Sequence, residues 1–271
     1  MSISPILDRE NSGVAVSPVD WVNGAPVRIV AITAIQKVRH TMIFDPMYFV
    51  FLIPGMAFVM FAQWKVTSTF KKFSNVPTNR KMTGAQVAEE ILRSNGIYDV
   101  PVERVPGQLS DHYDPRSRTL RLSEPVYGST SVAAVGVAAH EVGHALQHAQ
   151  GYAPLKLRST IVPVANIGNM LGPIMVIAGV LIGLTGLAWL GVIVFAAGTA
   201  FALVTLPVEF NASSRAMAQL TNIGVVDRTE YGQARKVLNA AALTYVAGFA
   251  AALLNLMYYV LLVTGMGRRN E

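Results

Sequence analysis

Residues 161–208 read IVPVANIGNMLGPIMVIAGVLIGLTGLAWLGVIVFAAGTAFALVTLPV, without a single charged side chain. A helix needs about 20 apolar residues to cross the roughly 30 Å of hydrocarbon in a bilayer. This run is too long for one span and suits two, with Gly183, Thr185 and Gly186 in the turn between them. The sequence therefore predicts a transmembrane hairpin that returns the chain to the side of the membrane from which it started.

Two other uncharged stretches, residues 47–64 and 237–266, are also long enough to cross a membrane. Tyr48 and Trp64 lie near the ends of the first stretch, as aromatic residues do at membrane interfaces. A buried helix of a soluble domain is the alternative for residues 47–64. However, the chain is 52% hydrophobic and 14% charged, with a mean hydropathy of +0.41, which is too apolar for an ordinary soluble domain. The sequence predicts a mainly α-helical membrane protein with several spans.

A cluster of basic residues directly follows the first predicted span, and it consists of Lys65, Lys71, Lys72, Arg80 and Lys81. An excess of Lys and Arg beside a span marks the cytoplasmic side. This placement also accounts for the net charge of +6, and no aromatic-and-basic RNA-binding motif occurs. We therefore expect a multi-pass protein of the plasma membrane, with no nucleic-acid partner.

A metal-binding pattern precedes the hairpin: HEVGH, from His140 to His144. Residues four apart share one face of a helix, so the two imidazoles would meet at one point and suit a zinc ion. Glu141 is offset by one residue and can take a proton from a zinc-bound water as general base. The same short pattern also occurs by chance on ordinary helices, so a third ligand must be found.

The chain has no cysteine, so any zinc ligand must be His, Asp or Glu. An even number of spans separates His144 from Glu209, which places Glu209 on the same side of the membrane as the two histidines. Two His and one Glu form a known catalytic zinc set. We interpret residues 209–220 as a helix with Glu209 in its first turn, where a Glu could instead only complement the helix dipole. His112, in a predicted turn, and His148, a capping or surface group, are the weaker alternatives.

The region between the first span and the HEVGH helix indicates a small α+β domain. Thr83 and Gln86 have the spacing of a capping box at the start of a helix, which Gly96 would end. Residues 100–106 and 118–123 alternate like strands, and residues 111–117 between them are rich in turn formers. We expect a two- or three-stranded sheet whose exposed edge could hold an extended peptide by backbone pairing.

Three further assignments remain open in the sequence. Ser213 would share the helix face of Glu209 and could hydrogen-bond a ligating histidine. Arg215 could stabilise an oxyanion or simply pair with a carboxylate, and the structural role is favoured. The oxyanion donor cannot be named from the sequence, with Arg215, Tyr113 and His112 as candidates.

Four motifs in order resemble the YugP-like neutral zinc metallopeptidases, a bacterial membrane family similar in layout to the HtpX-type proteases. They are DHYDPRSRTLRLS (111–123), AVGVAAHEVGHALQH (134–148), PVEFNASSRA (207–216) and KVLNAAALTYVA (236–247). The resemblance covers residues 46–266 and implies one zinc ion at His140, His144 and Glu209, with Glu141 as general base. HtpX-type proteins have an Asp four residues after the third ligand, where this chain has Ser213.

The resulting prediction is a membrane-embedded zinc metalloendopeptidase with a small α+β zincin-like catalytic domain. Its substrates would be proteins or peptides, and the resemblance suggests misfolded membrane proteins. A site-2-type intramembrane protease and a catalytically inactive zinc-bound scaffold are the rival readings. The expected organisation is an N-terminal extension (1–45), a first span (46–64), a catalytic region (65–158), a two-span hairpin (159–206), a third-ligand and return segment (207–239), a last span (240–266) and a tail (267–271).

Overall fold

The computed structural model describes residues 21–22, 25–26 and 46–267. The chain divides into two units, Met1–Asp45 and Pro46–Glu271. In the first unit, β1 (Trp21–Val22) and β2 (Ala25–Pro26) form an antiparallel pair. Most of the predicted N-terminal extension, and nearly all of the tail, lie outside the described residues.

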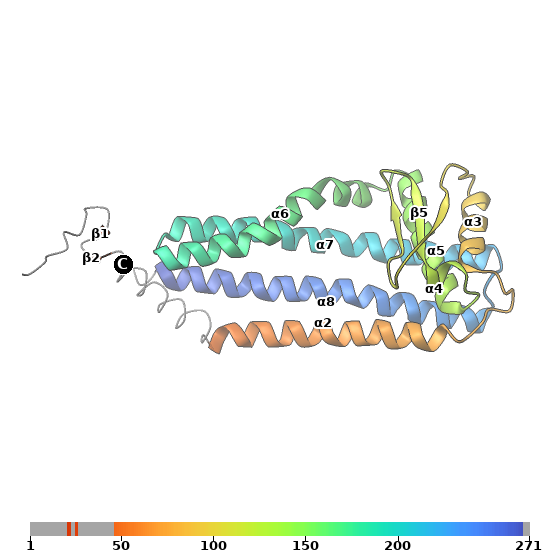
Figure 1. Cartoon of the computed structure of the whole chain (residues 1–271), viewed down its shortest axis with the longest axis horizontal. Helices are drawn as coiled ribbons and strands as arrows, with labels where there is room; N and C mark the ends of the chain where they lie inside the picture. Colours follow the sequence, from red (N-terminus) through yellow and green to blue (C-terminus); the bar gives the residue numbers. More distant parts are fainter. Residues whose placement is uncertain (1–20, 23–24, 27–45, 268–271) are drawn as a thin grey trace, which may run out of the picture. The chain divides into compact units, whose positions relative to one another are not determined.

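Four long helices of the second unit are apolar enough to cross a membrane, which confirms the mainly α-helical membrane fold. They run alongside one another in Figure 1, with a small sheet and shorter helices gathered at one end. Many large apolar side chains on these helices are exposed, as expected for surfaces that face lipid. The four helices are α2 (Pro46–Phe73), α6 (Ala153–Ile182), α7 (Thr185–Asn222) and α8 (Arg228–Gly267).

Helices α6 and α7 form the predicted hairpin, and glycines allow them to approach closely. A Cβ atom at Gly191 would lie 2.6 Å from the backbone nitrogen of Val176, so only a glycine fits at this contact. Gly183 ends α6 in the left-handed conformation with φ of 72°. Thr185 and Gly186 were expected in the turn but begin α7 instead, because Gly183 and Leu184 complete the turn between the two helices.

Helix α7 continues without a break from the membrane-spanning segment to the segment that carries Glu209. The prediction that Glu209 lies in the first turn of a separate helix is therefore wrong. Pro207 lies inside the helix, where a proline removes a backbone hydrogen bond and its ring crowds the carbonyl of the preceding turn. Val208 and Ala212 are buried beyond it, so tertiary packing of this face stabilises the helix through the proline.

The small domain contains helix α3 (Gly84–Ser94), a three-stranded sheet and the short helix α4 (Glu124–Tyr127). The capping box of Thr83 and Gln86 is confirmed. The sheet has the order β3-β5-β4, with β3 (Val102–Val105) parallel and β4 (His112–Asp114) antiparallel to β5 (Thr119–Ser123).

Part of the segment 111–117, which we expected to be a turn, is thus strand β4. His112 pairs with Arg121 in the ladder, and Asp114 pairs with Thr119. The turn itself is narrower, because the Asp114 carboxylate accepts hydrogen bonds from the Arg116 N–H at 2.9 Å and the Ser117 hydroxyl at 2.8 Å. Because the strand order is β3-β5-β4, β4 is an edge strand of the sheet.

Helix α5 (Val132–Ala149) carries the HEVGH pattern and packs among the helices of the small domain and the ends of α7 and α8. Ser131 caps its first turn by accepting a hydrogen bond from the Ala134 N–H. Nearly all of its residues are buried, and α3, α7 and α8 pack around it. Burial among these helices explains why the residues before His140 are so apolar.

Candidate metal centre

The HEVGH pattern lies on one helix, as the spacing predicts, and α7 crosses that helix beside it. The rings of His140 and His144 are 4.9 Å apart, centroid to centroid. At Gly143, between the two histidines, α5 touches the backbone of α7 at Ala212. This contact brings Glu209, one turn earlier on α7, against both imidazoles.

One carboxylate oxygen of Glu209 faces both histidines. Its Oε2 atom lies 3.3 Å from Nε2 of His140 and 3.5 Å from Nε2 of His144. All three potential ligand atoms lie within 4.8 Å of one another. Ligands at about 2.0–2.1 Å from a tetrahedral zinc ion stand about 3.3–3.4 Å from each other. The donor atoms and their spacing therefore fit a zinc ion.

The electrostatics of the cluster also favour a cation. The Glu209 side chain is only 2% exposed, and a carboxylate at such depth is costly without positive partners. Burial disfavours the charged imidazolium of His144, but the carboxylates of Glu209 and Glu141 outweigh that effect and raise the pKa of His144 above its usual value. A divalent ion would meet the same negative field.

Neighbouring side chains hydrogen-bond the Nδ1 atoms of both histidines, on the ring side away from Glu209. Ser213 Oγ lies 3.1 Å from Nδ1 of His140, so the predicted contact of this serine is confirmed. Gln147 Oε1 lies 3.0 Å from Nδ1 of His144. The Gln147 amide in turn donates to the Val208 carbonyl at 2.8 Å and to Asn211 Oδ1 at 3.0 Å. These contacts fix each ring so that its Nε2 atom faces Glu209.

Glu141 lies beside the cluster rather than in it. Its Oε2 atom accepts a hydrogen bond of 3.0 Å from the backbone N–H of Tyr113 on β4. The edge strand therefore fixes the orientation of this carboxylate. Its position beside the two histidines suits an acid–base group better than a third ligand.

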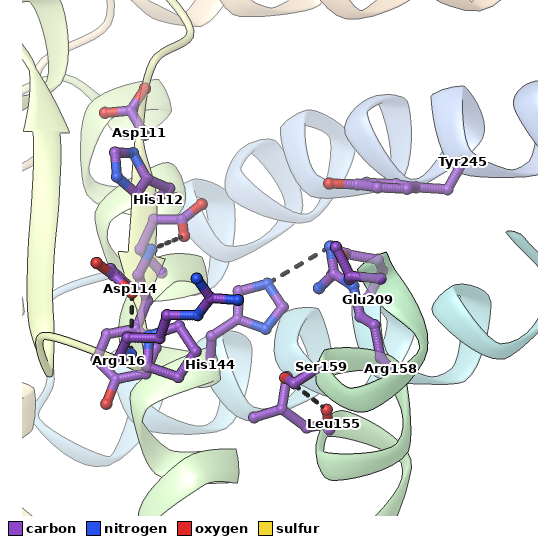
Figure 2. Close-up of a pocket in the computed structure, with 14 residues that line it drawn as sticks. Asp111, His112, Asp114, Arg116, His144, Leu155, Arg158, Ser159, Glu209 and Tyr245 are labelled. Atoms are coloured by element: carbon purple, nitrogen blue, oxygen red, sulfur yellow. Dashed lines mark hydrogen bonds and ion pairs between the residues drawn. The ribbon is translucent and has the colours of Figure 1, made fainter. Parts of the chain in front are cut away.

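Besides Gln147, the sequence does not predict Arg158 and Tyr245 at the cluster. Arg158, near the start of α6, donates from Nη1 to the second oxygen of Glu209, Oε1, at 3.0 Å. Tyr245 of α8 lines the adjoining pocket, and Figure 2 shows its hydroxyl directed into that pocket. Arg158 is the last charge before the uncharged run, which was a usable signal. Tyr245 lies within an apolar helix, and only tertiary packing brings it here.

The alternative residues weighed in the sequence have other contacts. His112 is exposed, and its Nδ1 atom lies 2.8 Å from the Ser110 carbonyl. His148 contacts the hydroxyl of Tyr113 through Nδ1 at 2.8 Å. Neither belongs to the group of side chains that could share an ion among residues 46–267. Arg215 donates to the amide oxygens of Asn211, at 2.6 Å, and Gln150, and lies over the ring of Tyr152. These contacts are structural, but the expected carboxylate partner is replaced by amides.

The segment around β4 forms one wall of the pocket, and hydrogen bonds hold its acidic residues. The hydroxyl of Ser117 and the N–H of Arg116 lower the pKa of Asp114 to about 2. Burial raises the pKa of Asp111, although Ser123 donates to it from both its N–H and its hydroxyl. Burial also raises the pKa of the Tyr113 phenol. Hydrogen bonds therefore hold this wall in place where it meets Glu141.

Four membrane-capable helices joined to a buried His-His-Glu group define a membrane protein with a candidate metal centre. The chain belongs to the family described as "Putative neutral zinc metallopeptidase", which matches residues 48–264. It is 48% identical over 217 residues to "Putative membrane protease YugP" of Bacillus subtilis (strain 168), a match that covers 80% of this chain and 96% of that protein. No solved structure matches the chain. The resemblance inferred from the four motifs is thus confirmed.

Proposed function

We propose that this protein is a zinc-dependent endopeptidase whose active site lies at the membrane surface, with one zinc ion held by His140, His144 and Glu209. The family description supports zinc and peptide substrates. The observation that carries the proposal is the 3.3 Å and 3.5 Å spacing of Glu209 Oε2 from the two imidazole nitrogens. Such an ion, when bound, polarises the scissile carbonyl and makes water more acidic.

The side chains around the cluster have distinct roles in this proposal. Glu141 is the general base, because its carboxylate lies beside the two histidines and is oriented by the Tyr113 N–H. It takes the proton of the attacking water and passes it to the leaving amine. Arg158 holds Oε1 of Glu209, which leaves Oε2 for the metal. Tyr245 donates a hydrogen bond from its hydroxyl to the oxygen of the scissile carbonyl as negative charge develops there.

The proposal places the site on the cytoplasmic side of the plasma membrane. Lys71 and Lys72 lie in the last turn of α2, at the end of the helices where the small domain gathers. Their positive charge there supports this orientation. Proteins or peptides that reach the membrane surface, misfolded membrane proteins among them, are the proposed substrates.

The decisive experiment compares the purified parent with Glu141→Gln in detergent, with casein as an unfolded substrate. The parent should contain zinc and cleave casein, and a chelator should stop cleavage. Glu141→Gln should retain zinc and lose cleavage. Equal cleavage by both proteins would show that Glu141 is not the base.

The same experiment separates the rival readings. A parent that binds zinc but cleaves neither casein nor a membrane-inserted peptide is an inactive scaffold. Cleavage of a membrane-inserted peptide without any cleavage of casein indicates a site-2-type intramembrane protease.

A further inference from the structure

Two pockets meet at the cluster, and Asp111, Glu141 and Tyr245 line both of them. The arginine pocket, of about 300 Å³, also includes His112, Asp114, Arg116, His144, Arg158 and Glu209. The apolar pocket, of about 230 Å³, also includes Val66, Phe70, Leu109, Val137, Leu238 and Ala241.

The boundary between the pockets runs through the proposed metal centre. His140 lines the apolar pocket, whereas His144 and Glu209 line the arginine pocket. Successive residues of an extended chain are about 3.3 Å apart and point alternately to opposite sides. A peptide whose scissile bond lies at the centre therefore places flanking side chains in both pockets.

Within the described part of the chain, the arginine pocket contains one cation without a partner. Its four carboxylates all accept hydrogen bonds or ion pairs: Asp114 from Ser117 and Arg121, Glu209 from Arg158, Asp111 from Ser123, and Glu141 from the Tyr113 N–H. The Arg116 guanidinium has no ion pair or hydrogen bond with any residue in 46–267, and Figure 2 shows its side chain extended over the pocket. An acidic side chain is the complement of this unpaired cation.

The apolar pocket has a rim that is held in an unfavourable backbone conformation. Leu109 has a φ of 57°, a left-handed conformation that branched side chains rarely adopt. Its side chain is 52% exposed although it lines an apolar surface. Strain of this kind persists where the surrounding structure imposes it, and it gathers at ligand-binding sites. An incoming apolar side chain would cover Leu109 together with Phe70 and Val66.

We propose that the substrates carry a large apolar residue on one side of the scissile bond and an acidic residue on the other. This inference rests on the proposed function, because it assumes that a peptide crosses the cluster. The apolar residue binds against Leu109 and Phe70. The acidic residue pairs with Arg116.

Arg116→Glu tests the acidic position. Paired peptides that differ only in Glu or Lys at each position flanking the bond are cleaved, and kcat/KM is compared. The parent should prefer Glu at one position by roughly tenfold, and Arg116→Glu should reverse that preference to Lys. Arg93→Glu, on the exposed face of α3, is the matched charge reversal and should keep the preference of the parent.

Leu109→Gly tests the apolar position, because glycine accepts the left-handed conformation and relieves the strain. The ratio of kcat/KM for a Leu peptide over its Ala counterpart should fall roughly tenfold, while thermal stability is kept. An unchanged ratio in Leu109→Gly, or an unchanged Glu preference in Arg116→Glu, would overturn the inference. A parent that cleaves no peptide at all defeats the proposed function instead.

Discussion

The carbonyl oxygen of Ala212 occupies the space that a side chain at Gly143 would need. A Cβ atom built on Gly143 would lie 2.5 Å from that oxygen and 3.1 Å from the Ala212 carbonyl carbon. The glycine inside the HEVGH pattern is therefore the point at which α7 meets α5. The distance from Glu209 to the two histidines depends on this contact.

Gly143→Ala should push α7 away from α5 and pull Glu209 out of the cluster. We expect a loss of about 1–3 kcal/mol in the free energy of unfolding, as for other overpacked contacts, and a fall in zinc content. Thermal unfolding in detergent and metal analysis measure the two effects.

The matched control is Gly136→Ala on the same helix. A Cβ atom there would lie 3.6 Å from the Cβ atom of Ala234, which is an ordinary contact. This variant should keep its zinc and its stability. If both variants behave alike, helix propensity rather than the α5–α7 contact governs the result.

Glu209→Gln should lose both zinc and cleavage. The amide has almost the shape of the carboxylate, but it removes the negative charge that faces His140 and His144. It also leaves Arg158 without its ion pair. Zinc content and casein cleavage are measured on the same sample, and full zinc occupancy would exclude Glu209 as a ligand.

Glu230→Gln provides the control for Glu209→Gln, since Glu230 is also a buried carboxylate. It lies in the first turn of α8 and accepts a hydrogen bond of 2.6 Å from the Asn79 N–H. We expect this variant to lose stability but to bind zinc like the parent. The comparison separates loss of a ligand from loss of a buried charge.

Ser213→Ala should weaken zinc binding roughly tenfold, because removal of a side chain that orients a ligand typically costs 10–100-fold in metal affinity. The alanine leaves Nδ1 of His140 without the contact at 3.1 Å. Competition with a chelator of known affinity measures the change. Ser213→Asp restores a hydrogen-bond acceptor and should recover the affinity, whereas a loss equal to that of alanine would contradict the orienting role.

Tyr245→Phe should lower kcat by about 100-fold, the usual effect of removing one donor to an oxyanion. KM should change little, since the ring remains in place to line both pockets. Steady-state kinetics on one peptide measure the two constants. A rise in KM with an unchanged kcat would assign Tyr245 to substrate binding instead.

The long-range layout of this protein was predictable because membrane spans and metal ligands leave strong local signals. An uncharged run of about 20 residues indicates a span. Because an even number of spans separates Glu209 from His140 and His144, all three lie on the same side of the membrane. The capping box of Thr83 and Gln86 was equally readable. Each of these signals depends on residue type and spacing alone.

Other features depend on packing that the sequence does not display. We expected a helix over residues 209–220 with Glu209 in its first turn, but the buried face of α7 continues through Pro207 to this segment. The turn formers around Asp114 concealed β4, whose pairing is decided by β5. Gln147 and Tyr245 are unremarkable in the sequence, and they reach the site only because α5, α7 and α8 pack together.

The hairpin of α6 and α7 separates the histidines from Glu209 along the chain. While such a chain is being synthesised, α5 emerges before α7. At that stage the peptide has the two histidines but lacks the third ligand, the carboxylate of Glu209. Glu209 is synthesised only after both spans of the hairpin. Arg158, which precedes the hairpin in the sequence, then forms an ion pair with it. Under the proposed function, membrane insertion would act as the activation step, and a nascent or mislocalised chain would have no proteolytic activity.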